Sequence, residues 1–189
     1  MAPEVLAGRA GGVLRGRRIG ILLLGRPVEV DLDRRTVRGE GGAEVSEVVA
    51  AVVVRYVALS GRLAEAGGEW VGFADNPDAR GYLGPFRGRV LAPLLAAFGA
   101  RPEAFAAAAR DLGGERVPSL EPPGSLAFRI AVLPRAVLVF VLCPGDEELP
   151  AEGQVLFPRE LFGAFAVEDL VGLAGLAAGA LRGRHPVPA

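Results

Sequence analysis

Two apolar segments separated by a two-residue turn signal constrain the fold more than any other feature of the sequence. They run over 126–133 and 136–142, with Pro134-Arg135 between them. The second segment contains no polar residue, so both faces of the strand it forms must be buried. The sequence therefore predicts a central β-hairpin that is buried on both faces.

A second hairpin is predicted near the N-terminus. An apolar run over 18–24 is followed by the turn signal Gly25-Arg26-Pro27, and residues 28–33 then alternate between apolar and acidic. Such alternation is typical of a strand with one face in solvent. The acidic face could converge on a cation, although a solvated strand face is the simpler interpretation; its residues are Glu29, Asp31 and Asp33.

Helical periodicity describes most of the remaining chain. Beyond a short helix within 1–16, the predicted helices are 45–63, 81–99, 102–112, 159–165 and 168–181. In the first of these five, Arg55 and Arg62 near the C-terminal end agree with the helix dipole. The two hairpins are predicted to form one antiparallel sheet that the helices cover, which gives a single α+β domain over 1–189 with a frayed tail at 183–189.

The last predicted helix carries glycine at every fourth position. Gly175 and Gly179 lie on it, and Gly183 follows it at the same spacing. This spacing lets another backbone approach closely. A coding bias toward glycine, alanine and arginine explains these residues equally well.

Missing residue types exclude several kinds of chemistry. The chain has no lysine, one histidine (His185) and one cysteine (Cys143). A Schiff base and a phosphate-binding loop lysine are therefore excluded. One imidazole and one thiol cannot complete a zinc site or an iron–sulfur cluster, so no metal site is predicted.

Charge and hydropathy restrict the partners and the compartment. The net charge is −1 and the sequence pI is near 5.9, which gives no long-range attraction to nucleic acid or anionic lipid. Arginines interrupt the N-terminal segment, and the uncharged stretch 170–181 is too short to span a bilayer. A single cysteine cannot form an internal disulfide. We therefore expect a cytoplasmic protein with no nucleic-acid or membrane partner.

One candidate ligand site combines aromatic and arginine side chains. Aromatic faces and guanidinium groups together suit a flat anionic ligand, such as a nucleotide or a tetrapyrrole. The alternative is ordinary core packing with arginines at the surface. The residues concerned are Trp70, Phe73, Tyr82, Phe86, Arg87 and Arg89.

A second candidate site is the acidic turn after the central hairpin, Asp146, Glu147 and Glu148. Loops that extend from a rigid scaffold commonly carry function. Asp146 and Glu148 are candidate catalytic residues, as an acid and base pair or as Mg²⁺ ligands; a solvated turn is the alternative. Because Arg87 and Arg89 would balance these carboxylates, the two regions are predicted to share one concave face, where Asp146 and Glu147 also contact the ligand.

The order of several short motifs resembles an uncharacterised family, domain of unknown function 3786, over roughly residues 15 to 182. These motifs are Gly68-Glu69-Trp70-Val71, Leu133-Pro134, 145–150, Leu156-Phe157 and Glu168-Asp169. The resemblance implies a setting in anaerobic bacteria and archaea, near anaerobic redox or corrinoid-dependent one-carbon metabolism. Some members look like fusions to a cysteine-rich iron–sulfur segment; with one cysteine here, a cluster would have to sit in a redox protein partner.

The leading function predicted from the sequence is a non-catalytic binding or accessory protein. It would hold a small anionic or cofactor-like ligand of unknown identity, or a redox partner. Two alternatives remain open. One is a carboxylate-dependent enzyme that uses Asp146 and Glu148, and the other is a structural subunit that assembles, for example as a homo-oligomer, through the glycine face of the last helix.

Overall fold

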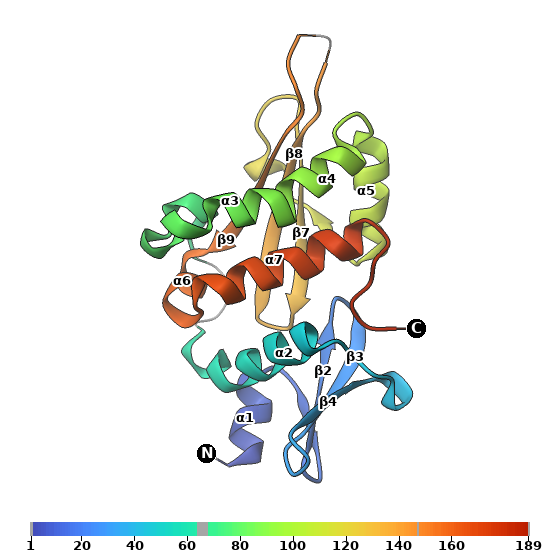
Figure 1. Ribbon diagram of the computed structural model, residues 1–189, viewed down its shortest axis with the longest axis vertical. Coiled ribbons are helices and arrows are strands. Elements are labelled where there is room, and N and C mark those ends of the chain that lie inside the picture. Colours follow the sequence, from blue (N-terminus) through green and yellow to red (C-terminus); the bar gives the residue numbers. More distant parts are fainter. Residues whose placement is uncertain (1, 64–67, 147, 189) are drawn as a thin grey trace.

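The computed structural model contains helices packed on two antiparallel sheets, and it describes residues 2–63, 68–146 and 148–188 (Figure 1). The predicted α+β class is confirmed. The prediction of one sheet is wrong, because the two predicted hairpins belong to different sheets. The short flanking strands β1 and β4, which sequence periodicity did not reveal, complete a separate N-terminal sheet.

The N-terminal sheet has four strands in the order β1-β2-β3-β4, and a short helix, α1 (Pro3–Arg9), precedes it. Its strands are β1 (Val13–Arg15), β2 (Arg18–Leu23), β3 (Arg26–Asp31) and β4 (Thr36–Gly39). The central strands bury alternate side chains such as Ile19 and Val30, which are partners in the register. Because β1 and β4 occupy both edges of the β2–β3 pair, this hairpin does not pair with the second sheet as a strand. It contacts β7 through β2 and through its turn, where the Leu24 N–H donates to the Val132 carbonyl (2.9 Å).

The second sheet has five strands in the order β5-β9-β8-β7-β6. They are β5 (Trp70–Gly72), β6 (Glu115–Arg116), β7 (Leu126–Leu133), β8 (Ala136–Cys143) and β9 (Glu152–Pro158). The β7–β8 pair is the central hairpin predicted from the sequence, with Phe128 opposite Phe140. Six of the eight residues of β8 are buried, which confirms that apolar neighbours cover both of its faces.

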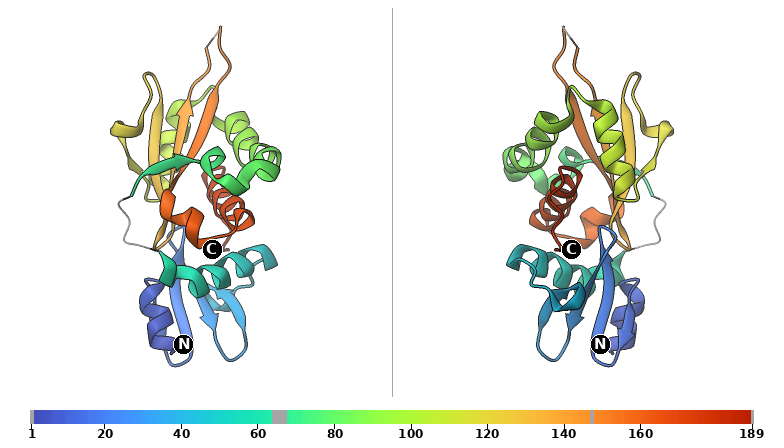
Figure 2. Two further views of the ribbon diagram at one scale, coloured as in Figure 1. Left: turned by 90° about the vertical axis from the view of Figure 1, so that its left-hand side faces the viewer. Right: turned by 90° about the vertical axis from the view of Figure 1, so that its right-hand side faces the viewer.

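Helices cover one face of the second sheet, as Figure 2 shows. They are α3 (Leu83–Phe86), α4 (Ala92–Phe98), α5 (Pro102–Asp111), α6 (Arg159–Ala164) and α7 (Val167–Leu181), whereas α2 (Glu47–Leu59) packs on α7, α1 and β4. Helix α7 is apolar nearly all round and contacts α2, α4, α5 and β7, as a buried helix must. Helix α2 lies between α7 and the N-terminal sheet (Figure 1).

The predicted helix over 81–99 is interrupted by a wider turn. Residues Arg87–Leu91 form a π-helical segment between α3 and α4, and the Ala92 N–H donates to the Arg87 carbonyl. Pro93 follows at once, and a proline has no N–H to continue the regular α-helical ladder. The chain therefore changes its hydrogen-bond spacing just before the proline.

The tail that was predicted to fray is packed against the N-terminal sheet. Val187 is fully buried, and its carbonyl accepts a hydrogen bond from Nη1 of Arg26 (2.6 Å). The His185 ring lies 3.1 Å from the Leu24 carbonyl through Nε2. The tail is ordered because the β2–β3 turn offers it both an apolar site and hydrogen-bond partners.

Candidate functional site

The predicted aromatic site is largely core. The rings of Phe73 and Phe86 are buried and stacked, with centroids 4.0 Å apart and planes 6° apart. Phe157 of β9 packs against both, at 6.0 Å and 6.2 Å. These rings therefore pack against one another in the core, and their faces are not exposed to a ligand.

Trp70 and Tyr82 lie apart from this cluster. Trp70 packs on the opposite face of the second sheet, beside Val139 and Val141. The Tyr82 hydroxyl donates to the Glu168 carboxylate, and this hydrogen bond is the main reason that the pKa of Tyr82 is raised. The four aromatic residues that are close in sequence thus occupy three different environments.

Arg87 and Arg89 are exposed on the π-helical segment. Within 2–63, 68–146 and 148–188, neither side chain has a hydrogen bond or an ion pair. Their surroundings give no indication of a ligand.

The acidic turn closes the β8–β9 hairpin. Oδ1 of Asp146 accepts hydrogen bonds from the backbone N–H groups of Glu148 (2.9 Å) and Leu149 (2.7 Å). The bond from Leu149 is the largest of the effects that lower the pKa of Asp146. Glu148 is exposed, and Glu147 lies outside the described residues. Asp146 therefore stabilises the turn.

The structure separates the acidic turn from the aromatic residues. Trp70 pairs with Pro158 at the end of β9, whereas Cys143, just before the turn, pairs with Glu152 at the start of that strand. A strand rises about 3.3 Å per residue, so the two sites are about 20 Å apart along β9. The hairpin end projects beyond the body of the molecule (Figure 1). The predicted shared concave face is not formed, because β9 carries the two regions to its opposite ends.

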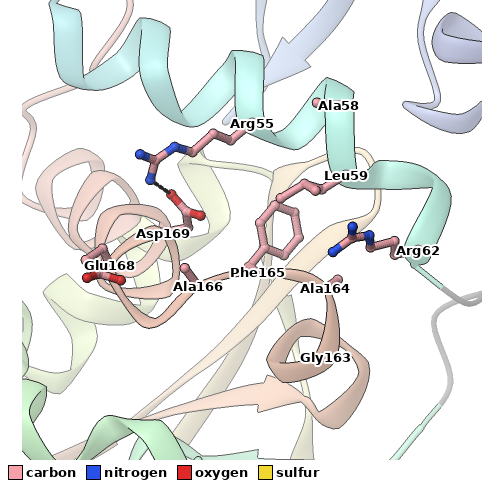
Figure 3. A pocket seen from close by; sticks show the side chains of 10 residues that line it. All are labelled: Arg55, Ala58, Leu59, Arg62, Gly163, Ala164, Phe165, Ala166, Glu168 and Asp169. Carbon is pink, nitrogen blue, oxygen red and sulfur yellow. Dashed lines mark hydrogen bonds and ion pairs between the residues drawn. The ribbon is translucent and has the colours of Figure 1, made fainter. Parts of the chain in front are cut away.

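A groove of about 740 Å³ lies instead between the C-terminal half of α2 and the connection from α6 to α7 (Figure 3). Leu59 and Phe165 provide apolar surface in its middle, together with small residues of the α6–α7 connection. The polar residues that line it are Arg55, Arg62, Glu168 and Asp169.

Local sequence explains how these side chains reach the groove. The Ser46 hydroxyl caps α2 by accepting from the Val49 N–H, and the helix then carries Arg55 and Leu59 on one side, with Arg62 in the turn that follows. Helix α7 begins at Val167 with acidic residues in its first turn, where the helix dipole favours negative charge.

Both carboxylates of the groove already have partners. Arg55 donates to Asp169, which is buried, and this hydrogen bond raises the pKa of Arg55. Glu168 accepts from Tyr82, and that bond is the main cause that lowers the pKa of Glu168. The remaining charged side chain, Arg62, is exposed and has no hydrogen bond or ion pair with any residue that the structure describes. Among the residues that the structure describes, the groove thus offers one cation without a partner, Arg62, beside an apolar surface.

Sequence reasoning assigned no ligand role to these residues. Arg55 and Arg62 were interpreted as charges at a helix end, and Glu168-Asp169 only as a family motif. The available signal is the spacing of Arg55, Leu59 and Arg62, which places two cations around one apolar residue at the C-terminal end of a largely apolar helix and in the turn that follows it.

Comparison with known proteins identifies the family. A family model described as Domain of unknown function (DUF3786) matches residues 2–180. The chain belongs to the DUF3786 family. A search of curated proteins and a search of solved structures found no match. The matched segment contains every residue that lines the groove of this DUF3786 protein.

Two further features of the DUF3786 protein concern metals and membranes. In the described part of the chain, His, Cys, Asp and Glu form no group of three that could hold a metal ion. No single helix among the same residues has the length and apolarity to cross a membrane, whereas one bent pair, Pro77–Phe98 with Pro102–Asp111, meets that test by length and composition.

Proposed function

We propose that this DUF3786 protein is a non-catalytic binding protein that holds a small anionic ligand in the groove between α2 and α7. The observation that carries the proposal is Arg62, an exposed cation at the groove without a partner among the described residues. A guanidinium group binds a carboxylate or a phosphate through two parallel hydrogen bonds. Arg62 would therefore hold the charged end of the ligand.

The size and lining of the groove support this proposal. Small-molecule sites commonly measure about 300–1,000 Å³ and combine apolar surface with a few placed polar groups. Leu59 and Phe165 supply the apolar surface in the middle of the groove (Figure 3). Beside this surface, the ion pair between Arg55 and Asp169 holds both side chains in place, so this part of the groove is preorganised.

The state of the carboxylates favours binding over acid–base catalysis. A general base that works near neutral pH needs a pKa close to neutral. The pKa of Glu168 is instead lowered by Tyr82, and the pKa of Asp146 by backbone N–H groups. A carboxylate-dependent enzyme built on Asp146 and Glu148 is thus the weaker of the two functions.

The metabolic setting remains a prediction. The link to anaerobic redox or corrinoid-dependent metabolism, the redox partner and the cytoplasmic location all follow from the resemblance or from composition. The groove supports the narrower statement, that the ligand is small and carries at least one negative charge.

The proposal is tested by thermal unfolding with small carboxylates in phosphate-free buffer, after native mass spectrometry of protein purified without oxygen. We expect at least one compound to raise the unfolding temperature in a saturable manner, since a ligand at 100 times its Kd adds about 2.7 kcal/mol. Arg62→Gln should remove this shift.

The matched control is Arg89→Gln, which removes the same charge from an exposed position that does not line this groove. It should keep the full shift. An Arg62→Gln protein that responds to the compound like the unaltered chain would contradict the proposal.

A further inference from the structure

A second depression lies at the far end of the N-terminal sheet. The register pairs Arg18 with Asp31, which brings the turn after β1 and the turn after β3 to the same end of the sheet. These two turns are the lowest part of the molecule in Figure 1. They enclose a depression of about 370 Å³, whose charged residues are Arg15, Arg17, Arg18, Arg34, Asp31 and Asp33.

The two carboxylates of this depression are already engaged. Asp33 binds Nε of Arg17 at 2.5 Å. Asp31 accepts backbone N–H bonds from Asp33 (3.0 Å) and Arg34 (2.9 Å), and the second of these is the main cause that lowers its pKa. Asp31 is therefore ionised at neutral pH, with its Oδ1 occupied by the turn that it closes.

The arginines of the depression exceed its carboxylates. Arg18 lies 3.4 Å from Asp31 and 3.2 Å from Glu29, so its charge is balanced. The side chains of Arg15 and Arg34 make no hydrogen bond or ion pair within the described ranges, and both are exposed. Arg15 ends β1 and Arg34 lies in the turn after β3, and both line one depression. Arg15 and Arg34 thus add two guanidinium groups that form no hydrogen bond or ion pair within the described ranges, while the Asp31 carboxylate attracts Arg34 at longer range.

We propose that this depression, the N-terminal basic site, binds the phosphate group of a small molecule, with Arg15 and Arg34 holding its oxygens. A phosphate dianion accepts hydrogen bonds on several oxygens, so it can satisfy guanidinium groups that approach from separate segments. A single carboxylate has only two oxygens to share between them. The site does not depend on the groove between α2 and α7.

Overall charge favours a small ligand over a polyanion. The chain has a net charge of −1, and the projecting β8–β9 turn at the opposite end of the long axis is acidic (Figure 1). A nucleic acid or an anionic membrane needs an extended basic surface, because affinity grows with each phosphate that is neutralised. A depression of about 370 Å³, with two arginines that form no ion pair in the described part of the chain, matches one phosphate group and a compact body.

Isothermal titration with inorganic phosphate and with glycerol 3-phosphate, at low ionic strength, tests the site. We expect saturable one-to-one binding, with the ester bound more tightly if the depression also holds the organic part. Charge-assisted hydrogen bonds are worth about 1.5–3 kcal/mol, so Arg15→Gln and Arg34→Gln should each weaken binding about 10-fold or more. All variants change exposed residues, and their unfolding temperatures show whether each one folds.

Three controls decide the outcome. Arg89→Gln should bind phosphate like the unaltered chain, which excludes an effect of net charge alone. Arg62→Gln should also bind phosphate unchanged, so that failure here and failure of the α2–α7 groove are distinguishable. Absence of saturable phosphate binding, unchanged affinity in Arg15→Gln and Arg34→Gln, or tighter binding of single-stranded RNA or phosphatidylserine vesicles at these arginines would overturn the proposal.

Discussion

At the scale of single residues, one buried hydroxyl connects three parts of the chain. Tyr56 of α2 is fully buried, and its hydroxyl donates to the Ala10 carbonyl (2.8 Å) and accepts from the Arg135 N–H (3.0 Å). The phenol thereby links α2 to the end of α1 and to the turn between β7 and β8. Sequence periodicity predicts that Tyr56 faces inward, but it does not reveal these two backbone partners.

Replacing Tyr56 with phenylalanine removes this link and nothing else. The Ala10 carbonyl and the Arg135 N–H would then be buried without partners, which costs about 1–3 kcal/mol. We expect the free energy of unfolding, measured with urea, to fall by that amount. Tyr82→Phe is the control and should change stability less, since its hydroxyl pairs with the Glu168 side chain near the surface. Equal effects of the two variants would contradict this assignment.

The ionisation of Tyr56 also makes the free energy of unfolding depend on pH in the alkaline range. Burial raises the pKa of Tyr56 to about 12, whereas the unfolded chain ionises near 10. The folded protein then holds a proton that the unfolded chain releases, so this contribution is complete below pH about 10 and is lost as the pH rises toward 12. Denaturation curves across this range should show falling stability, and the slope should be shallower in Tyr56→Phe.

At the scale of elements, two glycines of α7 make little close contact within the described chain. A Cβ at Gly175 would meet no atom within 4 Å, and one at Gly179 would meet only the Arg184 carbonyl oxygen, at 3.5 Å. Gly183 has a φ of +76° and ends the helix. The close approach occurs at Gly172, where a Cβ would lie 3.2 Å from Val52 of α2.

This difference between two glycines of one helix makes a matched pair of substitutions. Gly175→Ala should raise the free energy of unfolding by about 0.5–1 kcal/mol, because alanine loses less backbone entropy in a helix and meets no neighbour here. Gly172→Ala should gain less or nothing, since the new methyl group presses on Val52. Chemical denaturation measures both, and a loss of stability in Gly175→Ala would show that another surface covers this position.

At the scale of the whole molecule, the C-terminal tail packs against the N-terminal sheet and stabilises it. Deleting residues 184–189 removes the buried Val187 side chain and its carbonyl bond to Arg26. Burial of a valine is worth about 1.5–3 kcal/mol, so we expect a loss of at least that size in urea denaturation. Val187→Ala should reproduce part of it. A truncated chain as stable as the full one would mean that the tail contributes nothing to folding.

Acid should weaken the whole molecule through carboxylates with lowered pKa values. Arginine partners lower the pKa of Glu69 and of Glu121, and Tyr82 lowers that of Glu168. Such groups stabilise the fold fully above their unfolded pKa near 4.5, and this stability is lost as the pH falls below it. Unfolding free energies should therefore decline from pH 5 to pH 3, with a smaller decline in Glu121→Gln. A flat profile would contradict the pairing.

The sequence by itself determined the main elements, because apolar periodicity and turn residues act over a few neighbouring positions. The β7–β8 hairpin and the helices near 45–63, 102–112 and 168–181 follow from such local signals. Strands β1 and β4, of three and four residues, are too short to show a period, so the sequence does not predict a separate N-terminal sheet.

Only the tertiary structure decided which side chains meet. The direction of β9 separates the aromatic residues from the acidic turn, and the packing of α2 beside the start of α7 brings Arg62 to Phe165. The register of β2 and β3 likewise places Arg15 and Arg34 around one depression. Residue types show what chemistry is available to a chain, but their convergence depends on contacts between distant segments, which no local pattern encodes.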